Sequence, residues 1–144
     1  MNMKEQYIKI DEHGAKFYYS DKEMTVLHRE DGPAVEWADG YKAWCINNKL
    51  HREDGPAIER VDGTRCWYVD GTRHREDGPA VEDADGRKVW WVNGERHRED
   101  GPAVERTDGS KAWFINGKEF LTEDEFNDRN KPVEFTLDEI AEKM

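Results

Sequence analysis

The string His-Arg-Glu-Asp-Gly-Pro-Ala occurs four times in the sequence, beginning at His28, His51, His74 and His97. It places an acid–base group, a cation and two carboxylates side by side, and general acid–base catalysis uses such groups. Catalysis, however, needs one set of distinct groups that converge on one pocket, and four near-identical copies do not provide it. We therefore expect no catalytic residue and no enzyme activity.

We interpret the strings instead as a structural ladder. In this ladder each Arg pairs with a carboxylate of its own or the next unit, and each His forms a hydrogen bond near a turn. A repeated binding surface is the alternative interpretation of the same side chains. The residues concerned are His28, Arg29, His51, Arg52, His74, Arg75, His97 and Arg98.

The spacing of the strings argues against a metal site. Strands of a sheet lie ~4.8 Å apart, so a unit of two strands advances ~10 Å, whereas zinc ligands lie ~2.0–2.3 Å from the ion. His28 and His51 are therefore too far apart to share one ion. Cys45 and Cys66 occupy different positions within their units, which is typical of small packing residues. No phosphate-loop motif follows the Gly-Pro pairs, so we expect neither a metal nor a cofactor.

The strings also define the elements that must position them, because each follows the previous one by 23 residues. A fixed period of this length is typical of a repeat architecture. Each unit contains two turn pairs (Asp-Gly, Asn-Gly or Asn-Asn) that favour two-residue β-hairpin loops. We predict a mainly β protein, an elongated antiparallel meander of β-hairpin repeats. The units are 28–50, 51–73, 74–96 and 97–119.

The two ends of the chain differ from the repeats. Residues 1–27 look like a degenerate first unit, in which Tyr18 takes the place of the repeated Trp, and we expect them to cap the array. Residues 120–144 contain two capping-box motifs, Thr122-Glu-Asp-Glu125 and Thr136-Leu-Asp-Glu139. We predict two short C-terminal α-helices there, at about 122–129 and 136–143. With three basic and eight acidic residues, this cap is acidic.

The Asp-Gly turns predict a register for the sheet. A two-residue loop at Asp85-Gly86 places Val81 opposite Trp90, and the equivalent pairs in the other units form one packed stripe. The opposite face then carries residues that differ between units, together with one repeated Glu. Tyr and Trp are common anchors of protein interfaces. The partner-binding candidates are Trp37, Tyr41, Tyr68, Trp91, Phe114, Glu59, Glu82 and Glu105.

Composition limits the function classes. The chain has 144 residues, 33 of them acidic and 22 basic, for a formal net charge of −11. Because non-specific nucleic-acid binding needs a basic surface, we expect no direct nucleic-acid binding. No run approaches the ~18–20 apolar residues of a membrane span, and the first residues lack the apolar core of a signal peptide. Two cysteines make no disulfide framework, so we expect a cytoplasmic protein.

The 23-residue period, the paired turns and the Trp-Val-Asn-Gly stretch at 91–94 make residues 28–119 similar to MORN-type repeats. The string His-Arg-Glu-Asp-Gly-Pro-Ala resembles a MORN-like group common in tailed phages and giant viruses. The resemblance implies β-hairpins stacked into an elongated twisted sheet. It also implies a small viral accessory protein that acts inside an infected cell.

These observations predict a non-enzymatic interaction protein. We expect it to bind and modulate a host or defence protein. One alternative is an acidic mimic that occupies the DNA or RNA site of a nucleic-acid-binding protein. The other is a small-ligand or nucleotide binder that uses the repeated Arg and His with aromatic stacking.

Overall fold

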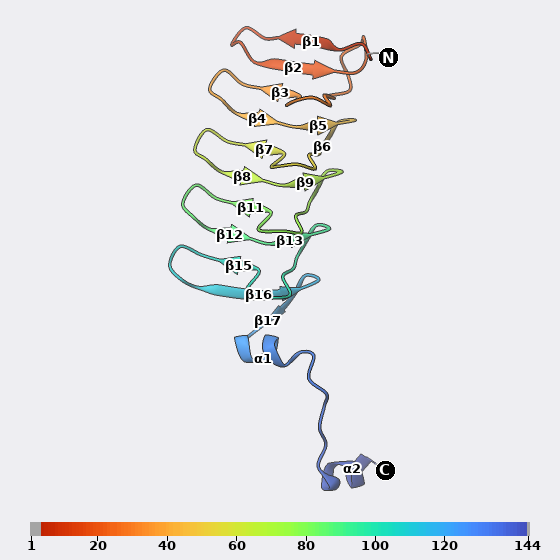
Figure 1. The fold of residues 1–144 in the computed structure, drawn as a ribbon, viewed down its shortest axis with the longest axis vertical. Coiled ribbons are helices and arrows are strands. Elements are labelled where there is room, and N and C mark those ends of the chain that lie inside the picture. The colour runs from red at the N-terminus through yellow and green to blue at the C-terminus, as the bar shows by residue number, and fades with distance from the viewer. Residues whose placement is uncertain (1–3, 144) are drawn as a thin grey trace.

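A computed structural model describes residues 4–143. Its main element is one eleven-stranded antiparallel sheet in which the strands follow one another along the chain and run across the long axis of the molecule (Figure 1). The predicted meander of hairpin repeats is confirmed. The strands of this sheet are β1 (Tyr7–Ile10), β2 (Lys16–Tyr19), β3 (Val35–Glu36), β4 (Lys42–Ala43), β7 (Ile58–Glu59), β8 (Arg65–Cys66), β11 (Val81–Glu82), β12 (Lys88–Val89), β15 (Val104–Glu105), β16 (Lys111–Ile115) and β17 (Lys118–Phe120).

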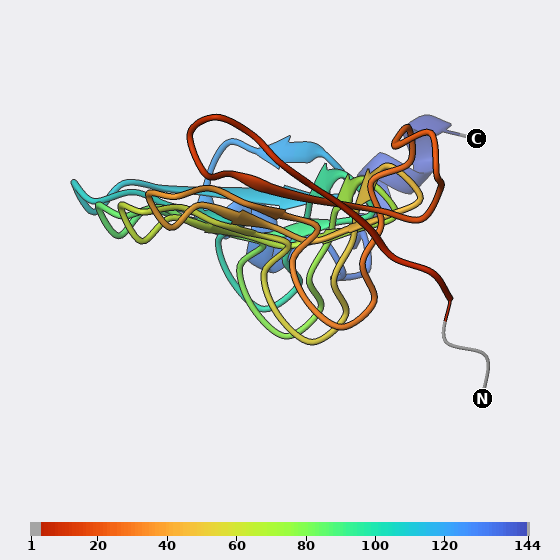
Figure 2. The same ribbon diagram turned by 90° about the horizontal axis from the view of Figure 1, so that it is seen from above.

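Each inner unit adds a second, shorter hairpin beyond its repeated Trp. These hairpins are β5 (Cys45–Ile46) with β6 (Lys49–Leu50), β9 (Tyr68–Val69) with β10 (Thr72–Arg73), and β13 (Trp91–Val92) with β14 (Glu95–Arg96). From each of them the chain enters the next His-Arg-Glu-Asp-Gly-Pro loop and returns to the sheet. Figure 2 shows these loops stacked behind one another on one side of the sheet.

The two turns of a unit belong to different classes. In the second turn, Asn93 and Gly94 have φ angles of 50° and 80°, as the predicted two-residue turn requires. In the first turn only Gly86 has a positive φ, of 100°. The Asp83 amide donates to the Arg87 carbonyl at 2.9 Å, so three residues form the loop. A type I turn followed by a left-handed Gly gives this geometry. The predicted two-residue loop at Asp85-Gly86 is therefore wrong.

The extra loop residue shifts the pairing by one position. Val81 pairs with Val89 and Cys66, not with Trp90. Because successive side chains of a strand point to opposite faces, a shift of one residue moves a whole strand's pattern to the other face. The expected stripe of Val or Ile with Trp is thus also wrong. A row of mostly buried residues crosses the sheet instead, which we call the core row: Phe17, Val35, Ala43, Ile58, Cys66, Val81, Val89, Val104 and Ala112.

The opposite face of the same strands carries a row of alternating charges, which we call the charged row. Each inner cation lies opposite a carboxylate on both neighbouring strands, as Lys88 does opposite Glu82 and Glu105. Opposite charges placed directly across strands stabilise a sheet. The row is Lys16, Glu36, Lys42, Glu59, Arg65, Glu82, Lys88, Glu105 and Lys111.

The helices lie at the C-terminal end of the sheet. They are α1 (Glu123–Asp128) and α2 (Leu137–Lys143), close to the predicted bounds. Phe126 of α1 is buried and contacts Phe120 edge to face, at 5.8 Å between ring centroids. Thr136 and Glu139 form the predicted capping box of α2, which has no buried residue and lies apart from the sheet (Figure 1). Only α1 therefore covers the end of the array.

Candidate functional site

The loops and the charged row form one side of the molecule, the loop side, and Arg75 shows how each loop is held there. Its guanidinium lies over the Trp67 ring of the preceding unit, with Cζ 4.0 Å from the ring centroid. It donates to the Asp77 carboxylate at 3.0 Å and to the Pro79 carbonyl at 3.0 Å. Glu82 of the charged row accepts at 3.2 Å. Arg29, Arg52 and Arg98 make the same contacts, over Tyr18, Trp44 and Trp90.

The glycine of each string packs against the other side of the guanidinium. A Cβ built on Gly78 would lie 2.9 Å from Arg75 Cζ, closer than carbon atoms approach. Its φ is not in the left-handed region, so space rather than backbone conformation requires glycine here. Each Arg is thus enclosed between a Trp or Tyr ring of one unit and the Gly of its own loop.

The histidines bind the second turn of their own unit. Nδ1 of His74 accepts a hydrogen bond from the Asn93 amide at 3.0 Å, which places the ring proton of the neutral form on Nε2. That nitrogen lies 3.6 Å from the Glu76 carboxylate. His28, His51 and His97 repeat this arrangement with Asn47, Asp70 and Asn116. The contacts expected of a ladder are therefore present, and the ladder also links neighbouring units.

Open notches separate consecutive loops on the loop side. One, of about 780 Å³, lies between the loops at 29–32 and 51–54, with Trp44 and Ile46 in its lining. The next, of about 730 Å³, repeats it with Trp67 and Val69. The carboxylates at the rims point to solvent, since the side chains of Glu53 and Asp54 are 84% and 89% exposed.

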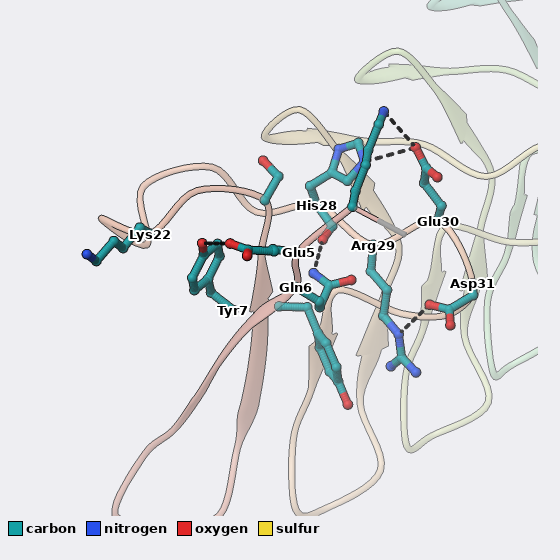
Figure 3. Close-up of a pocket in the computed structure, with 11 residues that line it drawn as sticks. Glu5, Gln6, Tyr7, Lys22, His28, Arg29, Glu30 and Asp31 are labelled. Atoms are coloured by element: carbon teal, nitrogen blue, oxygen red, sulfur yellow. Dashed lines mark hydrogen bonds and ion pairs between the residues drawn. The ribbon is translucent and has the colours of Figure 1, made fainter. Parts of the chain in front are cut away.

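The first notch, of about 850 Å³, has a different outer wall. No His-Arg-Glu-Asp-Gly-Pro loop precedes it. Residues 4–7 form the outer wall instead, beside Tyr18 and the loop at 28–31. Figure 3 shows Gln6 directed at the His28 backbone, where its amide donates to the carbonyl at 2.9 Å. Lys4 Nζ lies 3.8 Å from Glu30 Oε1, so this notch contains an ammonium–carboxylate pair.

The face with the core row carries the residues that vary between units, and we call it the variable face. Tyr68 and Trp91 are half-buried there and contact the core row. Trp37 is 50% exposed, and its ring is tilted by 40° against that of Tyr41, with 4.7 Å between the centroids. Phe114 is only 8% exposed, because it is itself part of the core. Of the aromatic candidates, Phe114 therefore offers the least surface.

The glutamates expected beside these aromatics lie on the other face. Glu59, Glu82 and Glu105 belong to the charged row, and each pairs with the Arg of its own unit's loop. The shifted register explains this difference, because it places Val81 rather than Glu82 on the same face as Trp91.

Arginines that the sequence analysis did not single out surround the aromatics of the variable face. A groove of about 390 Å³ is lined by Arg60, Arg73, Arg87 and Arg96, with Trp91 and two aspartates. Arg73 and Arg96 lie near the Trp91 ring, at 5.3 and 5.5 Å from its centroid. Arg96 Nε is buried without a hydrogen-bond partner. The sequence contained a signal for this groove, because these positions differ between units. Arg60 and Arg73 occupy the same positions in their unit as Trp37 and Leu50 do in the unit before it.

Burial also determines the state of the two thiols. Cys45 and Cys66 are free and buried. Burial raises the pKa of both thiols above the ordinary value, so they are protonated near neutral pH and poor nucleophiles.

Comparison with known proteins found no match for this chain among protein-family models, curated proteins or solved structures. Within residues 4–143, no helix has the length and apolar character needed to cross a membrane. The same residues contain no cluster of three or more metal-ligating side chains.

Proposed function

We propose that this protein is a non-enzymatic, MORN-like interaction module that binds another protein through its variable face. The observation that carries the proposal is the groove lined by four arginines and Trp91, at unit positions where the repeats differ. Trp, Tyr and Arg are the residues most enriched at the energetic centres of protein interfaces. The variable face is the part of this otherwise uniform array that gives each unit its own identity.

The chemistry of the groove indicates the kind of partner. Arg60, Arg73, Arg87 and Arg96 outnumber the lining aspartates, Asp62 and Asp83, although the whole chain is strongly acidic. A partner surface that presents carboxylates around an apolar centre fits this pattern. In keeping with the resemblance to viral repeats, we propose a host or defence protein as the partner.

The test compares baits in affinity capture from infected-cell lysate, followed by mass spectrometry. One bait is the wild-type chain, and a second carries Trp37→Ala, Arg60→Ala and Arg73→Ala, three exposed positions on the variable face. A matched control carries Glu12→Gln, Glu23→Gln and Glu134→Gln, three exposed positions outside the variable face and the His-Arg-Glu-Asp-Gly-Pro loops. We expect a protein that the wild type and the control retain and the variable-face variant loses. Equal capture by all three folded baits would contradict the proposal.

A nucleic-acid mimic would behave differently in the same assay. Its affinity would fall steeply with salt, because charge density alone would provide it. It would also depend on the acidic residues 120–144 and be unaffected by the three variable-face substitutions. The two functions are therefore distinguished by salt and by the position of the sensitive residues.

A further inference from the structure

We propose that the notches of the loop side bind an extended basic segment of a partner protein, with one Lys or Arg side chain in each notch. This site is separate from the variable face and does not depend on its function. The proposal concerns the inner notches, whose linings include Trp44 and Trp67.

The charge at the notches favours a cation. Two loops line each inner notch, and each loop contributes one Arg, one Glu and one Asp, as Arg52, Glu53 and Asp54 do. An excess of two negative charges therefore remains at each notch. Trp44 also lines the notch, but the Arg52 guanidinium already lies over its ring at 3.8 Å, so the carboxylates are what favour a further cation.

The first notch shows that a lysine side chain reaches this position. Residues 4–6 line it, and Lys4 Nζ lies 3.8 Å from Glu30 Oε1. Glu53 and Glu76 are the counterparts of Glu30 in the next two loops, and their carboxylates lie 3.6 Å from Nε2 of His51 and His74. The chain thus displays in one notch the contact that we propose for the others.

The period of the array selects the conformation of the segment. Successive units lie ~10 Å apart, because each contributes two strands at ~4.8 Å. A polyproline II helix rises 3.1 Å per residue with three residues per turn, so every third side chain lies on one side at a spacing of ~9.3 Å. In a β-strand, third neighbours point to opposite sides. We therefore expect Lys or Arg at every third residue of a polyproline II segment.

A pair of synthetic peptides of equal composition tests this register. One is (Lys-Pro-Pro)₄, and its control is a block of four lysines followed by eight prolines. Binding is measured by calorimetry on the full chain at low and moderate salt. Since linked sites bind cooperatively when the spacing fits, we expect the spaced peptide to bind at least ~10-fold more tightly. Equal affinity of the two peptides would overturn the proposal and indicate non-specific charge attraction.

Two variants locate the site. Glu53→Gln with Glu76→Gln should weaken the spaced peptide by about tenfold or more, because each contact in a linked set multiplies the affinity. Trp37→Ala with Arg73→Ala on the variable face should leave its affinity unchanged. Both Glu side chains are more than four-fifths exposed, so the melting temperature should not change. Unchanged peptide affinity in the Glu variant would refute the site, whatever the capture experiment shows for the variable face.

Discussion

The guanidinium of Arg75 is held from both sides, by the Trp67 ring and by the backbone of Gly78. Four such contacts, each between adjacent units, follow one another along the molecule. Isolated surface ion pairs contribute little to stability. Here the same cation also stacks on a ring and bonds to a backbone carbonyl, so its removal affects the joint between two units.

Gly78→Ala tests this enclosure. The new methyl group would meet Arg75 Cζ at 2.9 Å, and the φ of Gly78 does not itself exclude alanine. Overpacking of this kind costs about 1–3 kcal/mol, measured as the free energy of unfolding in urea. In an Arg75→Ala background the cost should fall to a few tenths of a kcal/mol, since the clash is gone. An equal cost in both backgrounds would show that the glycine is needed for another reason.

The buried thiols give a pH prediction. Burial raises the pKa of Cys45 and Cys66 in the folded state above the ordinary value of 9.0. Such a thiol ionises more readily in the unfolded chain, so it stabilises the folded state at pH values below its unfolded pKa. This stabilisation is lost as the pH rises through the folded pKa. Between about pH 7 and about pH 10, the free energy of unfolding should therefore fall less in a Cys45→Ala, Cys66→Ala variant than in wild type. An identical fall in both proteins would contradict this account.

At the scale of the strand, the charged row and the core row depend on one register. Lys88 lies between Glu82 and Glu105, and a slip of one residue would place these carboxylates opposite apolar side chains. Two-residue strands have few backbone hydrogen bonds with which to resist such a slip. The alternation of charge is therefore part of what specifies the pairing.

Lys88→Glu should disrupt this row. It places three carboxylates side by side, and like charges directly opposite cost ~0.2–1 kcal/mol per pair, so we expect a loss of about 1 kcal/mol in unfolding free energy. Lys88→Gln is the matched control and should cost less than half as much. Adding Glu82→Lys to Lys88→Glu should recover part of the loss. No recovery would mean that the pairing of these two side chains is unimportant.

The same strands show what the sequence could and could not predict. The 23-residue period, the Asn-Gly turns and the capping boxes each admit one local structure, so the meander and both helices were predictable. An Asp-Gly pair suits two loop lengths, one with two left-handed residues and one with a single left-handed Gly. Only the longer loop aligns Glu82 with Lys88.

The candidate sites depended on that one ambiguity. The aromatic residues Tyr68 and Trp91 were grouped correctly, because alternation within one strand does not depend on the loop. Their association with Glu59 and Glu82 was wrong, because it crossed the misjudged turn. The notches could not be predicted at all, since they arise only when loops stack in space.

At the scale of the whole molecule, the two helices should contribute unequally to stability. Phe126 of α1 packs on Phe120, and Arg129 donates to the Glu99 carbonyl at 2.7 Å, whereas α2 buries nothing. Truncation after Asn130 should leave the melting temperature nearly unchanged. Truncation after Leu121 should lower it by several degrees, since terminal caps stabilise repeat arrays. Equal effects of both truncations in calorimetry would contradict the assignment of α1 as the cap.

The direction of the strands has a mechanical consequence. They lie across the line that joins the two ends of the chain (Figure 1), so tension along that line would open their hydrogen bonds one after another, as a zip opens. Each unit would then yield separately and release 23 residues, which span up to about 80 Å at ~3.3–3.6 Å per residue. Because each repeat contacts only its neighbours, the released units can refold in turn. A partner pulling on one end would meet an extensible tether that gives way at low force, in equal steps.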